Sequence, residues 1–292
     1  MASSSDKPRV SRPRKPGSQN HGRSGRPSKG APKRHDGQRG GSDKAGRAGW
    51  DDPIVIFGIH AVAAALANPE RKFTRIMATE NAENRLSEAI AERGLAVERV
   101  RPKDLDRLLG AETVHQGVAA EVEALAEQEI SELIAAAGSG APVIILDQVT
   151  DPHNVGAVMR SAAVFGSAGL MTTRRHSPPL NGTLAKSASG ALELIPVALV
   201  QNLARAIEEL KAAGITVIGL DGEGETLLED HQLTGPIAFV LGAEGKGLRQ
   251  LTRETCSTVC RIGTTETLAS LNVSNAAAVA LHLSAMRRRA RN

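Results

Sequence analysis

Short apolar segments alternate with amphipathic segments along most of the chain from about residue 53 onward. Residues 143–147, "VIILD", have the continuous apolar character of a parallel strand that is buried on both faces. Residues 155–166, "VGAVMRSAAVFG", then carry apolar positions at helical spacing and stop at Gly166. The same alternation predicts further strands at 168–173, 194–200, 215–220, 236–242 and 258–263, and further helices at 181–192, 202–214, 247–256 and 272–289. This order predicts an α/β fold with a mainly parallel sheet that helices cover on both faces.

A smaller α/β unit is predicted before this sheet. Its pattern gives a short apolar entry and helix, a strand, an amphipathic helix that Gly94 closes, and two more strands, at 53–68, 73–79, 84–94, 96–100 and 114–122. An Ala- and Glu-rich connector follows, up to the Gly- and Pro-containing break "AAAGSGAP". We therefore expect a first domain at 53–123, a linker at 124–140 and a second domain at 141–290.

The first 50 residues have a different composition. They carry 13 Lys and Arg against three Asp, a net charge of +10, and the remaining residues have a net charge of −6. Because this tail is rich in Gly, Pro and Ser and has few large apolar residues, we expect it to be disordered. Such a tail would bind RNA or DNA with strong salt dependence and little sequence preference, although a purely solubilising tail is an open alternative.

Several other classes of site find little support in the composition. Cys256 and Cys260 have no nearby His or second Cys pair, so we expect neither a disulfide framework nor a metal site. With no apolar run near about 20 residues and no apolar signal core, a cytoplasmic protein without a membrane segment is expected. Aromatic residues make up only 2% of the chain, which argues against a platform that stacks successive bases.

Polar and small residues collect after three strands of the second domain. Asp147, Asp151, Asn154 and Arg160 follow the first strand, and "GAEGKG" at 242–247 and "TTETLASLNVS" at 264–274 follow two later strands. Ligands of parallel sheets bind outside the carboxyl ends of the strands, so these three segments are predicted to converge on one pocket. With Asn275, which follows it, the last segment brings together Ser270, Asn272 and Ser274, and these four residues exceed the need of one helix N-cap, which indicates that some of them face a ligand.

The segment "LGAEGKGL" is not a nucleotide-binding motif of a common kind. It lacks the first Gly and the Ser or Thr of a phosphate-binding P-loop, and it does not follow the Gly-x-Gly-x-x-Gly dinucleotide fingerprint. A nucleoside triphosphatase and a nicotinamide-dependent enzyme are therefore disfavoured.

Three segments together carry a family resemblance. "DPHNVGAVMRSAAVFG", "FVLGAEGKGLRQLT" and "TLASLNVSNAAAVAL" resemble, in order and spacing, the three motifs of the SpoU (TrmH-like) branch of SPOUT RNA 2′-O-ribose methyltransferases. "GIHAV" and "VHQGVAAEV" resemble the L30e-like substrate-binding domain that precedes the catalytic domain in the large-subunit rRNA guanosine methyltransferases of that family. The resemblance covers about residues 53 to 290 and not the basic tail.

This resemblance implies a fold and an activity. It implies a SPOUT domain whose C-terminal part forms a trefoil knot, a homodimer with composite active sites, and S-adenosyl-L-methionine as cofactor. The reaction implied is 2′-O-methylation of a guanosine ribose in large-subunit (23S) rRNA. A tRNA substrate and a non-catalytic RNA-binding factor of ribosome assembly are the alternatives, and cofactor binding would separate the second of these from an enzyme.

The motif positions also imply roles for individual residues. The polar catalytic positions are Asn154, Arg160, Glu244, Ser270 and Asn272, with Glu244 expected to hold Arg160 or Asn154. The cofactor positions are Gly242, Ile262 and Leu271, with Leu241, Ala243 and Leu268 nearby. Residues 181–192 resemble the family's segment beside the RNA, which makes Lys186 and Ser189 candidate RNA contacts.

Overall fold

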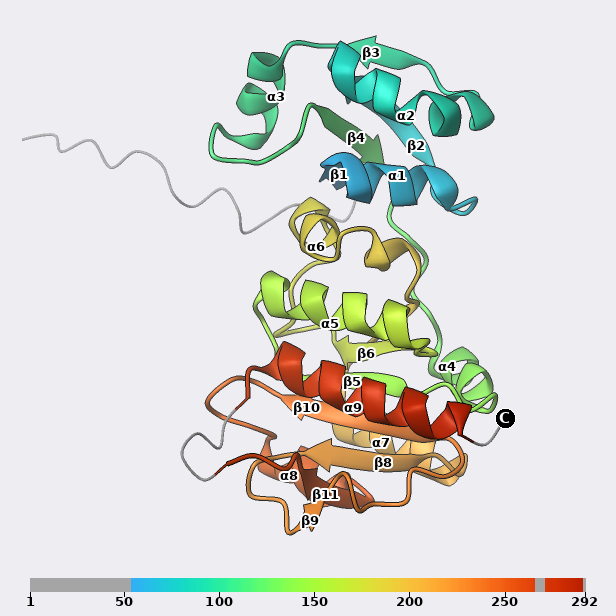
Figure 1. Cartoon of the computed structure of the whole chain (residues 1–292), viewed down its shortest axis with the longest axis vertical. Helices are drawn as coiled ribbons and strands as arrows, with labels where there is room; N and C mark the ends of the chain where they lie inside the picture. The colour runs from blue at the N-terminus through green and yellow to red at the C-terminus, as the bar shows by residue number, and fades with distance from the viewer. Residues whose placement is uncertain (1–53, 266–270, 291–292) are drawn as a thin grey trace, which may run out of the picture. The chain divides into compact units, whose positions relative to one another are not determined.

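The computed structural model describes residues 54–265 and 271–290 of the 292-residue chain (Figure 1). The predicted disordered tail and the two site candidates Leu268 and Ser270 lie outside the described residues.

The larger sheet is parallel throughout its described strands. Its order is β7-β6-β5-β10-β8-β11-β9, and every neighbouring pair runs parallel. The strands are β5 (Val143–Asp147), β6 (Gly169–Thr173), β7 (Val197–Val200), β8 (Thr216–Leu220), β9 (Thr226–Leu227), β10 (Ile237–Gly242) and β11 (Thr258–Arg261). The α/β fold with a mainly parallel sheet is thereby confirmed.

Helices cover both faces of this sheet, as the alternation predicted. Ile144 and Leu146 of β5 pack in one core with α5, α6 and α9, whereas Val143 and Ile145 pack in the other core with α4 and α7. The helical elements are α4 (Ile130–Ala137), α5 (Pro152–Phe165), α6 (Gly182–Ser187), the 3-10 turn η1 (Ala191–Glu193), α7 (Leu203–Ala212), α8 (Gln250–Thr255) and α9 (Val273–Arg289). None of the helices within 54–265 and 271–290 has the length and apolar character needed to cross a membrane.

Helix α4 lies inside the stretch expected to be a linker. Ile130, Leu133, Ile134 and Ala137 repeat at helical spacing, and the side chains of Leu133 and Ala137 are buried in the core beneath β5. The Glu132 side chain accepts a hydrogen bond from the Glu129 N–H at 2.9 Å and so closes the first turn. The Ala- and Glu-rich composition concealed a short amphipathic helix that belongs to the larger sheet.

The N-terminal unit is a four-stranded sheet with three helices. Its order is β1-β4-β2-β3, in which β4 runs antiparallel to both neighbours and β2 and β3 are parallel. The elements are β1 (Ile54–Phe57), α1 (Ile59–Ala67), β2 (Phe73–Ala78), α2 (Glu80–Glu92), β3 (Val97–Arg99), α3 (Pro102–Leu109) and β4 (Val118–Val122). Helix α3 was not predicted, and α2 begins earlier than expected because Thr79 caps its first turn.

Helix α5 is held at both ends. At its start Asp151 accepts a hydrogen bond from the His153 N–H at 2.9 Å, and at its end Gly166 adopts the left-handed conformation, with φ 67°. Arg288 of α9 donates to the Phe165 carbonyl at 2.5 Å and to the Gly166 carbonyl at 3.3 Å. The last carbonyls of α5 are therefore satisfied by a cation, which also favours the helix dipole.

An ion pair between an exposed arginine and a buried carboxylate joins the end of β5 to the start of α8. The Asp147 carboxylate is fully buried and accepts from the Arg249 Nε at 2.6 Å and from the Arg249 N–H at 3.0 Å. The two loops that follow β5 and β10 are thus tied together at the carboxyl edge of the sheet.

We expect Asp147→Asn to lower the free energy of unfolding by about 2 kcal/mol, because the buried acceptor loses its charge-assisted hydrogen bonds with Arg249 and the new amide NH2 is buried against the guanidinium. Chemical denaturation measures this loss. Asp151→Asn is the matched control, because Asn caps a helix as well as Asp does. Equal stability of the two variants would contradict a structural role for the Asp147 carboxylate.

Candidate active site

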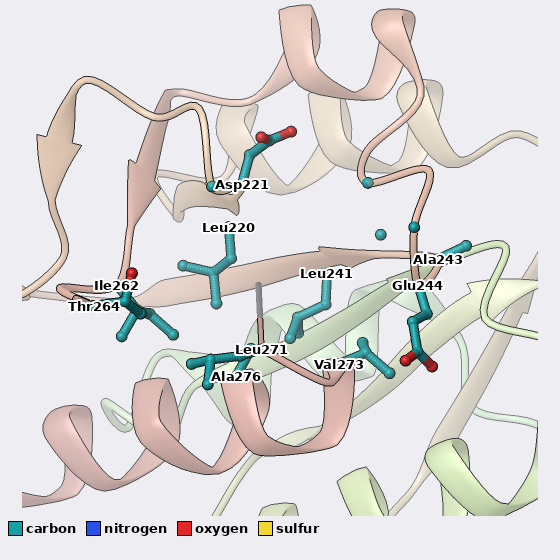
Figure 2. A pocket seen from close by; sticks show the side chains of 14 residues that line it. Leu220, Asp221, Leu241, Ala243, Glu244, Ile262, Thr264, Leu271, Val273 and Ala276 are labelled. Carbon is teal, nitrogen blue, oxygen red and sulfur yellow. The ribbon is translucent and has the colours of Figure 1, made fainter. Parts of the chain in front are cut away.

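A pocket opens at the carboxyl edge of the larger sheet (Figure 2). The ends of β8, β10 and β11 and the start of α9 line it. The lining residues are Leu220, Asp221, Gly222, Leu241, Gly242, Ala243, Glu244, Gly245, Gly247, Ile262, Thr264, Leu271, Val273 and Ala276. Of the three segments predicted to converge here, those after β10 and β11 line the pocket and the segment after β5 does not, whereas the segment after β8 was missed.

The loop after β10 presents backbone to this pocket. Ala243 and Gly247 form an isolated bridge, and the Gly247 N–H donates to the Ala243 carbonyl at 2.9 Å. A Cβ atom on Gly242 would lie 2.1 Å from the backbone of Gly247, so only glycine allows this close approach. The glycines of "GAEGKG" therefore serve a compact reversal of the chain beside the pocket.

Apolar side chains from several segments face one another across the pocket. Figure 2 shows Leu220, Leu241, Ile262 and Leu271 gathered around its centre. In the figure the Asp221 carboxylate lies above this group and the Glu244 carboxylate lies to its right. Such a surface, mostly apolar with backbone polar groups and few charges at its rim, suits a small ligand with a flat apolar part and polar edges.

The carboxylate of Asp221 is held in place. It accepts hydrogen bonds from Arg253 Nη1 at 3.2 Å and from the Glu223 N–H at 3.0 Å, and its side chain is 13% exposed. The residue follows β8, at the same edge as the glycine loop. In the sequence, Asp221 is a single carboxylate directly after an apolar strand. Such a residue is too common to indicate a site.

Asn154 and Asn272 come together although they are 118 positions apart. The Asn272 Nδ2 donates to the Asn154 Oδ1 at 3.0 Å, while the Asn272 Oδ1 accepts from the Ser274 N–H at 2.9 Å. Asn272 thus caps α9 and also contacts the start of α5. Asn272 therefore does more than cap the helix, and this second contact explains part of the excess of polar residues after β11.

Two other predicted catalytic residues are exposed. Arg160 projects from α5 and Glu244 from the loop after β10, and the side chain of neither forms a hydrogen bond or ion pair with any residue in 54–265 or 271–290. The expected contact of Glu244 with Arg160 or Asn154 is therefore not formed within this chain.

The candidate RNA contacts lie at the junction of the two α/β units. Lys186 Nζ donates to Gln116 Oε1 of the N-terminal unit at 3.0 Å, and burial lowers the pKa of this lysine. Ser189 is exposed and adopts a positive φ of 50°. Lys186 is thus partly engaged by the protein itself, and its RNA contact stays a prediction.

The remaining chemistry-bearing residues have structural surroundings. Cys256 and Cys260 are both buried free thiols, and burial raises the pKa of Cys256 to about 11. Within the ranges that the structure describes, no group of three or more His, Cys, Asp or Glu side chains is placed to hold a metal ion.

Fold and pocket define an α/β protein with a small-molecule site at the carboxyl edge of a parallel sheet. The SpoU rRNA Methylase family matches residues 141–282, and the family described as RNA 2'-O ribose methyltransferase substrate binding matches residues 55–128. The chain therefore belongs to the SpoU family of rRNA methylases.

Individual relatives agree with this membership. The chain is 39% identical over 233 residues to the 23S rRNA (guanosine-2'-O-)-methyltransferase RlmB of Xylella fastidiosa. The aligned region covers 77% of this chain and 93% of the relative. It is also 39% identical over 243 residues to the RlmB of Shewanella oneidensis, with 80% and 98% covered.

Solved structures share the fold. The SpoU methyltransferase AviRb from Streptomyces viridochromogenes, in complex with AdoMet, superposes with a TM-score of 0.68 at 23% identity, covering 81% of this chain and 91% of AviRb. An AdoMet-bound rRNA methyltransferase from Sinorhizobium meliloti gives 0.66 at 22% identity, with 81% and 87% covered.

We expect Gly242→Ala to weaken cofactor binding at least about tenfold, because its Cβ displaces the loop backbone that borders the pocket. Titration calorimetry with S-adenosyl-L-methionine measures the dissociation constant. Lys246→Ala, an exposed change in the same loop, is the control. Equal affinity of both variants and the native chain would show that this loop does not shape the cofactor site.

Proposed function

We propose that this protein transfers a methyl group from S-adenosyl-L-methionine to the 2′-oxygen of a guanosine ribose in 23S rRNA. The observation that carries the proposal is the Asn154 to Asn272 hydrogen bond next to the pocket, because it joins the first and third motifs around one site. Relatives named RlmB that align over nearly their whole length support the choice of rRNA.

The residues of the pocket fit this cofactor. Leu220, Leu241, Ile262 and Leu271 would enclose the adenine ring, and the backbone of 242–247 would bind its polar edge. Asp221 offers a carboxylate to hydroxyl or ammonium groups at the rim. When bound, the cofactor supplies an electrophilic methyl group on a positively charged sulfur.

The polar side chains of the three motifs would position and activate the ribose. A 2′-hydroxyl is a poor nucleophile at neutral pH, so the site must stabilise its deprotonated form and hold it in line. Arg160 cannot act as a base, because guanidinium is effectively always protonated; it would stabilise the developing alkoxide and grip the adjoining phosphate. Asn154, Ser270 and Asn272 would orient the ribose, and Glu244 would hold Arg160 across a dimer interface.

A homodimer would complete the site. Arg160 is exposed on α5, and exposed apolar side chains accompany it on α5 and α9, which lie side by side in Figure 1. Val164 is 77% exposed, Val279 40% and Met286 54%, and the last two are seven positions apart on one face of α9. An exposed apolar stripe beside an unpartnered catalytic cation favours burial against a second copy.

The finer architecture belongs to the same proposal. We assign 1–50 to a basic tail, 53–123 to an L30e-like domain that binds the RNA, 124–140 to a connecting segment that contains α4, and 141–290 to a SPOUT domain with a C-terminal trefoil knot. The knot rests on the family resemblance, and the packing of α9 against β10 and α5 agrees with it. An rRNA substrate agrees with the cytoplasmic location expected from the sequence.

Of the alternatives, the substrate-binding match at 55–128 favours rRNA over tRNA, and the assembled Asn154–Asn272 pair favours an enzyme over a non-catalytic assembly factor.

We expect Arg160→Lys to lower turnover by about 100-fold or more while cofactor affinity stays unchanged, because a point charge cannot replace the planar guanidinium. Labelled S-adenosyl-L-methionine, unmodified 23S rRNA and mapping of alkali-resistant ribose measure the effect. Arg205→Lys, an exposed change on α7, is the control. Full activity of Arg160→Lys would reject its role, and label in tRNA alone would overturn the substrate.

We expect removal of residues 1–50 to weaken rRNA binding and to reduce its salt dependence. The slope of log affinity against log salt should fall by about 0.7 for each phosphate contact that the tail no longer makes. Filter binding across salt concentrations measures the slope. A full-length variant with the 13 Lys and Arg of the tail replaced by Gln separates charge from length. Identical slopes in all three proteins would favour a solubilising tail.

A further inference from the structure

The two α/β units belong to one compact body, and a short segment of the larger unit forms most of their contact. We call residues 182–193, from the start of α6 to the end of η1, the docking segment. Figure 1 shows α6 between α1 of the N-terminal unit and α5 of the larger unit. The docking segment therefore touches the substrate-binding domain on one side and the helix that carries Asn154 and Arg160 on the other.

A buried ion pair fastens the C-terminal end of the docking segment. Arg71 donates to the Glu193 carboxylate through Nη2 at 2.6 Å and Nε at 3.1 Å, and both side chains are only 2% exposed. Arg71 Nη1 also donates to the Glu123 carbonyl at 2.7 Å, and Asn68 Nδ2 donates to Glu193 at 2.9 Å. A bidentate buried pair with its other polar atoms satisfied accepts one geometry only.

Direct backbone contact fastens the N-terminal end. A Cβ atom on Gly182 would lie 1.9 Å from the Val55 carbonyl oxygen of β1. Gly182 has no positive φ and occupies the first position of α6, where alanine is well tolerated by the backbone. This glycine is therefore required by the neighbouring domain and not by its own helix.

The opposite side of the docking segment is equally close to α5. A Cβ atom on Gly156 would lie 2.6 Å from the Ser187 Cβ, and Ser187 Oγ lies 3.3 Å from His153 Nδ1. Asn154 follows His153 directly and makes the hydrogen bond to Asn272. A shift of the docking segment would thus reach the residues that face the ribose.

Resting on the proposed function, we propose that the docking segment fixes the RNA-binding domain in one orientation toward the methyl-transfer site. Gly182, Arg71 and Glu193 are positioning residues for the rRNA substrate and do not touch it. RNA bound to the N-terminal domain then presents its target ribose to α5 at a fixed distance. Misplacement of a reacting group by about 1 Å can cost about 100-fold in rate.

The test uses Gly182→Ala and Glu193→Gln, with Thr183→Ala, an exposed neighbour in α6, as the matched control. Spin labels on Glu88→Cys of α2 and Gln201→Cys after β7 report the distance between the domains in full-length chains diluted with unlabelled protein. Both native cysteines are buried and do not compete for the label. Steady-state kinetics on an rRNA fragment and cofactor titration complete the measurements.

We expect a narrow distance distribution in the native chain and in Thr183→Ala, and a broad one in the other two variants. Those two variants should lose about 100-fold in kcat/KM for rRNA, mainly through kcat, because bound RNA no longer presents its ribose in line, at unchanged cofactor affinity. Narrow distances in every variant, broad distances in the native chain, or broad distances with full rRNA activity would each overturn the proposal. If the native chain methylates no rRNA, the proposed function fails, while the distances still decide whether the segment fixes the domains.

Discussion

The parallel pairing of β10 with β5 is the constraint on which the rest of the site depends. Residues 143–147 match 238–242 one to one, so Asp147 lies opposite Gly242 at the carboxyl edge. Both strands are buried on their two faces, and a change of register would move every apolar side chain to the wrong core. This register places the two following loops side by side, where the Asp147 to Arg249 ion pair joins them.

Helix α9 can close the site only because this edge is fixed. Its start carries Leu271 and Val273 to the pocket and Asn272 to Asn154, while its end satisfies the last carbonyls of α5 through Arg288. Two contacts at opposite ends therefore hold α9 along α5. The packing of α9 along α5 fixes where Asn154 and Asn272 lie relative to each other. This explains how two side chains far apart in the sequence reach hydrogen-bond distance.

The sequence predicted the elements whose apolar pattern is strong and missed those whose pattern is short. β5 was placed at its observed bounds because its four consecutive apolar residues are too few for a helix and are typical of a strand buried on both faces. β9 has two residues and α3 buries only Leu105, so neither repeats an apolar position often enough to be recognised. Helix α4 was hidden by its alanines, although the spacing of Leu133 and Ala137 could have revealed it.

The residues of the site were likewise predicted where a local sequence pattern exists and missed where it does not. Motif positions located Gly242, Ile262 and Leu271 at the pocket, because close backbone approach and apolar contact leave fixed residue types in a sequence. Asp221 was missed, since its position depends on the pairing of β8 with β10, which no local pattern encodes. The docking segment was likewise invisible: Gly182 reads as a helix start, and only the fold shows that the Val55 carbonyl excludes a side chain there.

The distribution of charge limits how the N-terminal unit can bind RNA. Residues 54–128 carry nine Lys and Arg against 12 Asp and Glu, so the unit that matches a substrate-binding family is itself net negative. Its exposed arginines are largely engaged, since Arg75 pairs with Glu98 and Glu121 and Arg99 pairs with Glu83. Phosphates would have to displace these carboxylates, and counterion release from RNA needs cations that are free to replace the ions. We therefore expect long-range attraction to come mainly from the tail of charge +10, while the two domains would supply the geometry in which one ribose meets the pocket.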